Sequence, residues 1–372
     1  MNKKLRILQF PIAASKGGIT QYVLNLWKYV NRELIQFDFL TFSSDLDFEK
    51  ELINEGCKVY HISCYPETNI EKFVMEYSAV LSYGYDVIEL HTSYWKSTIM
   101  EEMAKEQGGC KVIIHAHSTG IVSKLSYFEK INAKERHKKI RNMLNETIAD
   151  NFWACSKEAA EWLYGDKVPR EKIEIINNTI DTSLFKYREG IRQRKRQELN
   201  LADKYVIGHV GRLEEEKNHN FLLEIFAKLH TKQPQSILLL VGDGSYRQFI
   251  EERIIELRIS DCVCLVGKTD NVSDYLHVMD VFVFPSLFEG FGLSLLEAQC
   301  SGLRCIGSTN VPKTAFVTKC AERVSLDEPD RWSCILEETA KGYDRKPQDL
   351  LLREKGFDTV TQIRKLERKY ME

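Results

Sequence analysis

The sequence lacks an excess of charge of either sign, and it lacks any long hydrophobic run. Its 52 lysines and arginines face 54 aspartates and glutamates, which gives a formal net charge of −2. This balance excludes a protein drawn to nucleic acid by its overall charge. No apolar run reaches the roughly 18 residues that a membrane-spanning helix needs, so we expect no helix that crosses a bilayer.

Two common signatures are also missing. The 10 cysteines include no CxxC pair, which argues against a zinc site built from cysteine pairs. Residues 5–10 alternate apolar and polar side chains like a first strand rather than a signal peptide, so we expect reduced cysteines and a cytoplasmic location. No GxGxxG motif follows a predicted strand, which disfavours a nicotinamide cofactor.

What the chain does have is a regular alternation of short apolar runs with helical patterns, which is typical of α/β domains with parallel sheets. A length of 372 residues suggests two domains. We predict strands at 5–10, 37–42, 59–62, 87–90, 112–115 and 151–154, and then at 206–210, 237–241, 263–266, 281–284 and 303–306. The two series predict two Rossmann-like domains, residues 1–185 and 186–355. An amphipathic helix at 356–372 is expected to return to the first domain.

The most informative stretch follows the predicted strand at 281–284. Gly290 and Gly292 open the backbone before a helix, and Glu289 and Glu297 lie on either side of this turn. Backbone N–H groups at a helix N-terminus favour phosphate, and carboxylates accept hydrogen bonds from sugar hydroxyls. The alternative is an ordinary turn between strand and helix with a surface glutamate.

Other loops of the second half carry cations and glycines at corresponding positions. Arg212 and Lys217 follow the strand at 206–210 and could neutralise a diphosphate, unless they belong to a solvated charged loop. Gly242 and Lys268 lie in two further turns that could line the same cleft.

The first half contributes a glycine pair and a histidine pair. Gly17 and Gly18 follow the first strand and open a helix, which suits close approach of a phosphate or sugar, although a plain turn would look the same. His115 and His117 end another strand and alternate onto one face. A neutral histidine bonded to a hydroxyl is favoured here, because a metal site needs a third ligand that the sequence does not identify.

A basic segment at 123–145 contains seven lysines and arginines and two glutamates, interleaved with apolar residues. Such a helix can lie on an anionic membrane surface. A solvated helix face explains the pattern equally well.

Taken together, these motifs resemble those of glycosyltransferase family 4, the retaining enzymes of the GT-B fold, and in particular bacterial capsular and exopolysaccharide glycosyltransferases. The resemblance covers nearly the whole chain. The motifs that carry it are Gly17-Gly18, His115-Ala-His117, Ala154-Cys-Ser156, Asn177-Asn-Thr-Ile-Asp181, the GR…K motif of Arg212 and Lys217, and the E-x7-E motif of Glu289 and Glu297. It implies two Rossmann-like domains facing across a cleft, with neither cofactor nor metal.

The resemblance also implies roles for residues of the second half. Arg212 and Lys217 would bind the donor diphosphate and stabilise the departing nucleotide. Glu289 would contact hydroxyls of the transferred sugar, and Glu297 would bind the ribose. The backbone of the intervening turn would bind the phosphate and sugar through Gly290, Phe291, Gly292 and Leu293.

In the first half, Gly17 and Gly18 would approach the diphosphate. His117 would be the histidine near the sugar, with His115 as the rival.

The implied activity is transfer of a sugar from a nucleotide-sugar, expected to be a UDP-sugar, to a saccharide or lipid-linked saccharide, with no nucleic acid involved. A lipid-linked acceptor would bring the protein to the inner face of the membrane. The alternatives are an enzyme like UDP-N-acetylglucosamine 2-epimerase and a non-catalytic nucleotide-sugar-binding subunit.

Overall fold

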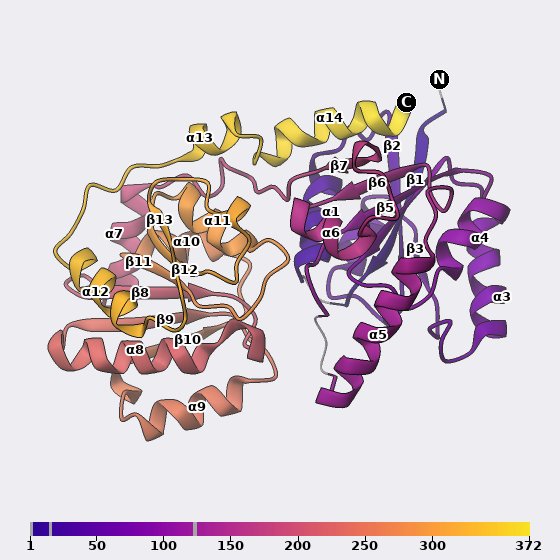
Figure 1. Cartoon of the computed structure of the whole chain (residues 1–372). Helices are drawn as coiled ribbons and strands as arrows, with labels where there is room; N and C mark the ends of the chain where they lie inside the picture. Colours follow the sequence, from indigo (N-terminus) through magenta and orange to yellow (C-terminus); the bar gives the residue numbers. More distant parts are fainter. Residues whose placement is uncertain (1–2, 15–16, 122–124) are drawn as a thin grey trace. The chain divides into compact units, whose positions relative to one another are not determined.

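The computed structural model describes residues 3–14, 17–121 and 125–372, and the chain divides into two compact units (Figure 1). The N-terminal unit comprises Met1–Thr179 and Thr359–Glu372, and the C-terminal unit comprises Ile180–Asp358. The sequence placed these boundaries at 185/186 and 355/356. Each unit is a parallel sheet with helices on both faces, so the predicted α/β fold class is confirmed.

The N-terminal unit is built on a sheet in which the described residues form seven parallel strands in the order β3-β2-β1-β4-β5-β6-β7. Their bounds are β1 Leu5–Ile12, β2 Ile35–Thr41, β3 Val59–His61, β4 Val87–Thr92, β5 Lys111–Ala116, β6 Asn151–Ala154 and β7 Ile173–Ile175. The helices of this unit are α1 Gly18–Tyr29, α2 Glu49–Asn54, α3 Ile70–Leu81, α4 Ile99–Gln107, α5 Tyr127–Met143, α6 Lys157–Tyr164 and α14 Thr359–Met371.

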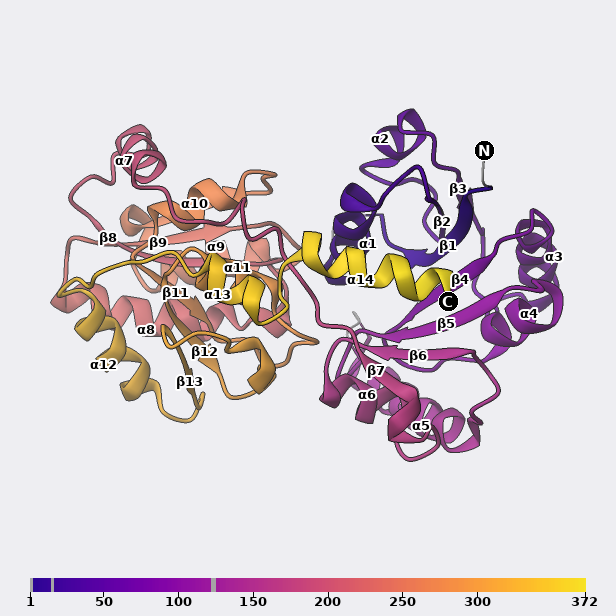
Figure 2. The ribbon, with the colours of Figure 1, turned by 90° about the horizontal axis from the view of Figure 1, so that it is seen from above.

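Strand periodicity sorts the side chains of this sheet onto two faces. Ile7 packs into the cluster that includes α1 and α14, whereas its neighbour Leu8 packs into the cluster that includes α3, α4 and α6. The apolar residues Ile363, Leu366 and Tyr370 of α14 are buried in the first of these clusters. Figure 2 shows α14 beside α1 on that face, so the last helix of the chain completes the core of the first unit.

The C-terminal unit has a parallel sheet in the order β10-β9-β8-β11-β12-β13 among the described residues. The strands are β8 Tyr205–Val210, β9 Ser236–Val241, β10 Val263–Gly267, β11 Val281–Phe284, β12 Arg304–Ser308 and β13 Ala321–Val324. The helices are α7 Glu189–Glu198, α8 His219–Lys232, α9 Arg247–Glu256, α10 Val272–Val278, α11 Leu293–Cys300, α12 Pro329–Thr339 and α13 Asp349–Glu354. None of the helices described in either unit has the length and apolarity to cross a membrane.

Both sheets contain one strand that the sequence analysis missed. All eleven predicted strands are present, but β7 and β13 were not predicted. Each is an edge strand of three or four residues whose burial is mostly partial. Such strands lack the continuous apolar run by which a buried parallel strand is recognised.

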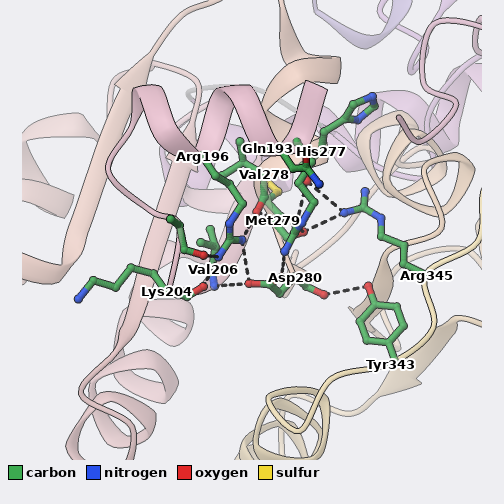
Figure 3. Close-up of polar contacts among 12 residues, drawn as sticks. Gln193, Arg196, Lys204, Val206, His277, Val278, Met279, Asp280, Tyr343 and Arg345 are labelled. Atoms are coloured by element: carbon green, nitrogen blue, oxygen red, sulfur yellow. Dashed lines mark hydrogen bonds and ion pairs between the residues drawn. The ribbon is translucent and has the colours of Figure 1, made fainter. Parts of the chain in front are cut away.

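A cluster of arginines around Asp280 fastens α7 to the start of β8 and β11 (Figure 3). The Asp280 carboxylate accepts from Arg192 at 2.5 Å, from Arg196 at 3.2 Å and from the backbone N–H of Val206 at 2.7 Å. Arg192 and Arg345 also donate to the carbonyls at the C-terminal end of α10, where positive charge is favoured by the helix dipole.

We expect Asp280→Ala to destabilise the C-terminal unit by about 3–5 kcal/mol, because it leaves Arg192 and Arg196 partly or fully buried without their carboxylate. Hydrogen–deuterium exchange of β8 and β11 peptides measures this loss, with β1 and β4 peptides as the internal reference. The control is Asp344→Ala, an aspartate whose side chain is 75% exposed and whose removal should change stability by less than about 0.5 kcal/mol. Unchanged exchange in β8 and β11 would contradict the assigned role.

Candidate active site

The site residues predicted in the C-terminal unit lie on loops at the carboxyl ends of its central strands. The chain runs from β8 outward to β9 and β10, and then returns to place β11, β12 and β13 on the other side of β8. β8 and β11 are therefore neighbours at the point where the strand order reverses, which is where open α/β sheets bind ligands. The loops carrying Lys217 and Glu289 follow these two strands.

Lys217 and Glu289 form an ion pair across this point. The Lys217 ammonium donates to Oε1 of Glu289, and the Ser286 hydroxyl donates to the same oxygen at 2.8 Å. The side chains are only 13% and 11% exposed, and the ammonium lies 5.2 Å from the centre of the Phe284 ring. A partly desolvated cation and carboxylate are thus placed together by two loops that are 72 residues apart in sequence.

Arg212 is more exposed than this pair. Its guanidinium contacts Glu216 of the same loop at 3.1 Å, and the arginine side chain is 51% exposed. Exposed pairs of this kind contribute little to stability. Exchanging the Arg212–Glu216 contact for a contact with an anionic ligand would therefore lower the stability of the protein only slightly.

The turn that begins α11 requires glycine at one position. Gly292 has a φ of +96°, and a Cβ there would lie 3.1 Å from the Phe284 ring. Leu293 is the first residue of α11, Phe291 is buried, and Gly290 precedes them in the turn. The arrangement leaves the N-terminus of α11 beside the Lys217–Glu289 loops, as a phosphate-binding turn needs.

Glu297 lies on α11 and is partly buried. Burial raises the pKa of its carboxyl to about 7, from an ordinary value of 4.5. At neutral pH the group is consequently divided between the neutral and ionised forms, and a ligand that donates hydrogen bonds to it favours ionisation.

Two other predicted residues are positioned differently. Gly242 has a φ of +138°, and a Cβ there would lie 2.0 Å from the carbonyl oxygen of Gly211, so glycine is needed for loop packing beside Arg212. Lys268 follows edge strand β10, with β9 between that strand and β8. The backbone N–H of Gly242 donates to the carbonyl of Gly267 at 3.0 Å, so the turn that carries Lys268 adjoins the turn of Gly242. A role of Lys268 in lining the cleft stays a prediction.

In the N-terminal unit, Gly17 and Gly18 form the start of α1 with ordinary backbone angles. Among the described residues, no atom lies within 4 Å of a Cβ added at either position. These glycines therefore leave room at a helix N-terminus rather than relieve strain. Their proposed contact with a diphosphate stays a prediction.

His115 and His117 belong to a buried polar cluster at the ends of β4 and β5. Their ring centres are 4.0 Å apart. The cluster also contains His91, which pairs with His115 in the register of the two strands. Burial lowers the pKa of His115 to about 3 and the pKa values of His91 and His117 well below 6.5, so all three rings are neutral at pH 7.

The sequence analysis missed His91, Gln9 and Glu89, although a signal was present. The predicted strand at 87–90 is directly followed by His91, and period-two alternation puts Glu89 and His91 on one face. The order of the strands is needed to show that Glu89 and His91 of β4 lie between Gln9 of β1 and His115 of β5. Which of His115 and His117 faces a sugar stays a prediction.

A cavity of about 340 Å³ adjoins this cluster at the ends of β1, β2 and β4. His91, Tyr65, Trp95 and Glu101 are among its lining residues. Burial raises the pKa of Glu101 to about 8, which leaves a neutral carboxyl beside mainly apolar walls.

The basic segment forms α5, which is capped by Ser126 and Glu129 in a reciprocal capping box. The first two residues of the segment, 123 and 124, lie outside the described part of the chain. Phe128, Ile131 and Met143 are 76%, 42% and 73% exposed, so apolar side chains reach solvent among the lysines.

Comparison with known proteins agrees with this geometry. The family model described as "Glycosyltransferase Family 4" matches residues 16–184, and the one described as "Glycosyl transferases group 1" matches residues 191–330. The chain belongs to the family 4 glycosyltransferases. The predicted family and enzyme class are therefore confirmed.

Relatives and solved structures extend over most of this glycosyltransferase. EpsF of Bacillus subtilis (strain 168) is 29% identical over 87% of this chain and 84% of its own length. The UDP-Gal:alpha-D-GlcNAc-diphosphoundecaprenol alpha-1,3-galactosyltransferase of Escherichia coli is 28% identical over 64% of this chain and 62% of its own. Anabaena Alr3699/HepE, solved in complex with UDP-glucose, superposes with a TM-score of 0.80 at 20% identity, covering 98% of this chain and 99% of its own.

The pKa of Glu297 generates a prediction about nucleotide-sugar binding. If the ribose donates to an ionised Glu297, the dissociation constant of UDP-glucose should rise about tenfold between pH 8 and pH 6, as protonation competes with binding. Isothermal titration of the wild type and Glu297→Gln checks this, since the glutamine variant should bind more weakly and show no such pH dependence. The same slope in both proteins would exclude Glu297 as its source.

Proposed function

We propose that this glycosyltransferase moves a sugar from a UDP-sugar to a saccharide or lipid-linked saccharide, with retention at the anomeric carbon. The observation that carries the proposal is the Lys217–Glu289 pair at the reversal of strand order, next to the N-terminus of α11. UDP-glucose in the HepE structure and a UDP-galactose donor in the name of the E. coli relative support uridine as the base.

Sugar transfer of this kind requires the negative charge on the leaving diphosphate to be stabilised. As the bond between the anomeric carbon and the phosphate oxygen breaks, the sugar becomes oxocarbenium-like and negative charge grows on the diphosphate. Lys217 and Arg212 would stabilise that charge more strongly in the transition state than in the ground state. The acceptor oxygen then bonds to the same face of the sugar, its proton passes to the leaving phosphate oxygen, and UDP departs.

Glu289 has two conceivable roles in this reaction. As a nucleophile it would form a covalent sugar ester, which requires a carboxylate behind the anomeric carbon. Its Oε1 already accepts from both Lys217 and Ser286. These two donors lower the nucleophilicity of the carboxylate, and we therefore assign Glu289 to binding the sugar hydroxyls.

The acceptor side of the proposal rests on the N-terminal unit. The cavity beside His91 is lined by Tyr65, Trp95 and other aromatic side chains, and sugars stack readily on such rings. His117, which is 7% exposed, is proposed to meet the sugar, with fully buried His115 behind it.

We expect Lys217→Met to lower the turnover of UDP-sugar by about 10²–10³-fold, because one fixed donor to the leaving group is lost. UDP release from UDP-galactose and UDP-glucose, with and without GlcNAc-diphosphoundecaprenol, measures the rate. The matched control is Lys232→Met, which removes an exposed lysine paired with Glu337 and should leave the rate unchanged.

NMR of the product tests the stereochemistry. An α-linked product from an α-linked donor supports retention, and a β-linked product contradicts it. Isomerised UDP-sugar in the absence of acceptor would indicate an epimerase. Tight UDP binding without any UDP release would indicate a non-catalytic subunit.

A peripheral membrane contact through α5 is the remaining part of the proposal. We expect the fourfold variant Lys134→Gln, Arg136→Gln, Lys138→Gln and Lys139→Gln to weaken binding to anionic vesicles by about 4 kcal/mol, near 1 kcal/mol for each cation. Co-sedimentation with anionic vesicles measures this loss of binding. The control neutralises four exposed lysines of the C-terminal unit, Lys228, Lys232, Lys341 and Lys346. Equal binding of the two variants would exclude α5 as the membrane contact.

A further inference from the structure

A continuous chain of hydrogen bonds joins four buried side chains of the N-terminal unit. The side-chain amide of Gln9 lies 3.0 Å from Oε2 of Glu89 on one side and 2.6 Å from Nε2 of His91 on the other. Nδ1 of His91 lies 2.9 Å from Nε2 of His117. Gln9 belongs to β1, Glu89 and His91 belong to β4, and His117 directly follows β5, so three parts of the sequence contribute to the chain.

Glu89 fixes the direction in which these hydrogen bonds are donated. A carboxylate only accepts, so the amide nitrogen of Gln9 faces Glu89 and the amide oxygen faces His91. Nε2 of His91 must therefore carry a proton and donate it to that oxygen. Tyr370 and His115 also donate to Glu89, which keeps both of its oxygens in the role of acceptors.

The direction passes on to His117 because both rings are neutral. Burial lowers the pKa of His91 and of His117 well below 6.5. A neutral imidazole carries one ring proton, so Nδ1 of His91 is a bare lone pair that accepts a hydrogen bond. Nε2 of His117 must then be the donor, and Nδ1 of His117 is left without a proton.

A second branch of the network ends inside the protein. Nδ1 of His115 donates to Oε1 of Glu89 at 2.9 Å, so Nε2 of His115 is its bare nitrogen. This ring is fully buried, and among the described residues its Nε2 has no hydrogen-bond partner. His117 is 7% exposed, so of these two histidines it is the one that a ligand can reach.

We propose that the hydrogen bonds from Glu89 through His91 hold His117 in its Nε2-protonated form, so that Nδ1 of His117 accepts a hydrogen bond from a sugar hydroxyl. Glu89, Gln9 and His91 are then positioning residues, because they act through His117. The inference rests on the proposed function, in which His117 meets the sugar. It adds the chemical class of the group that is bound, a hydroxyl that can donate.

This arrangement makes the site selective for that hydroxyl. A fluorine, an ether oxygen or a keto oxygen at the same place offers only lone pairs and cannot donate to Nδ1 of His117. A site built to bond a substrate hydroxyl rejects the analogue that lacks it, since the polar group of the protein is left unpaired. For one hydrogen bond we expect discrimination of roughly 10–100-fold.

The tautomers can be measured in the free protein without substrate. In full-length protein labelled with ¹⁵N in its 9 histidine rings, NMR separates protonated from bare ring nitrogens. We expect a proton on Nε2 of His91 and His117 and on Nδ1 of His115. Loss of each signal in His91→Gln, His115→Gln and His117→Gln assigns it. A proton on Nδ1 of His117 in the wild type overturns the inference.

Glu89→Gln tests whether the carboxylate sets the direction. The new side chain has nearly the same shape, keeps an oxygen for His115, and offers an amide nitrogen that can donate to Gln9. Gln9 can then turn its own nitrogen toward His91, which reverses the tautomers along the chain. We expect the Nδ1-protonated form of His117 to appear in this variant.

The matched control is Glu76→Gln. Glu76 is a carboxylate of the same unit that accepts from Ser63 and lies outside the network. Its replacement should leave all three histidine tautomers unchanged. Unchanged tautomers in Glu89→Gln as well would overturn the role assigned to Glu89.

Substrate analogues test the consequence for the reaction. UDP-sugars with single hydroxyls replaced by fluorine probe the donor, and acceptor saccharides with the same replacements probe the acceptor. We expect one position in one of the two sets at which the loss of kcat/KM is roughly 10–100-fold in wild type and Glu76→Gln but smaller in Glu89→Gln. Fluorine also slows bond breaking in every variant, so the comparison between proteins is decisive. The set that contains this position identifies the sugar that meets His117.

The outcomes separate this inference from the proposed function. Turnover with the same fluorine penalties in wild type and Glu89→Gln overturns the inference and leaves the transferase activity standing. No turnover of any UDP-sugar overturns the proposed function, and the NMR signals then decide the tautomer of His117 alone. If Glu89→Gln does not fold by circular dichroism, the wild-type tautomers and the analogue series on His117→Leu decide. Leucine removes the acceptor, so unchanged selectivity in that variant overturns the inference.

Discussion

The N-terminal unit depends on one buried carboxylate, that of Glu89. Within the described chain it receives hydrogen bonds from Gln9 on β1, His115 on β5 and Tyr370 on α14. An ionised carboxylate without water is tolerated only when such donors replace its hydration. The requirement therefore fixes the position of Tyr370 on α14, the orientation of Gln9 and the tautomer of His115 together. The chemistry available at the ends of β4 and β5 follows from that single constraint.

In the C-terminal unit the group that needs a partner is a cation, the ammonium of Lys217. If Lys217 binds an anionic ligand as proposed, its ion pair with Glu289 holds the cation in place at the ends of β8 and β11. Lys217 and Glu289 come into direct contact because the strands before them, β8 and β11, are neighbours. The more exposed Arg212 pairs with Glu216 on its own loop. In the proposed reaction both ion pairs would be exchanged for contacts with the substrate. The N-terminus of α11 contributes a fixed positive pole beside them.

Much of this arrangement could be predicted from the sequence, because buried parallel strands and the turns after them leave strong local patterns. The Arg212–Lys217 and Glu289–Glu297 segments were found from such turns. The edge strands β7 and β13 were missed because partial burial gives them no apolar run. His91 and Glu89 were missed for another reason. The role of a single polar residue in a strand depends on which residues lie beside it on the neighbouring strands. That depends on the strand order β1-β4-β5, which belongs to the tertiary structure and cannot be read from a local sequence pattern.

The discontinuity of the N-terminal unit has a consequence for biosynthesis. A ribosome delivers residues 1–179 first, but Ile363, Leu366 and Tyr370 arrive only after the whole C-terminal unit. At about 5–20 residues per second, the 179 residues of Ile180–Asp358 impose a delay of roughly 10–40 s. During that time the sheet face that packs against α14 is covered only in part, by α1 and its neighbours, and Glu89 lacks the hydrogen bond from Tyr370. The later unit is contiguous and can fold at once. The first domain to be synthesised is thus the last to be completed, and the nascent chain presents the part of its apolar sheet face that α14 will cover to the chaperones around the ribosomal exit.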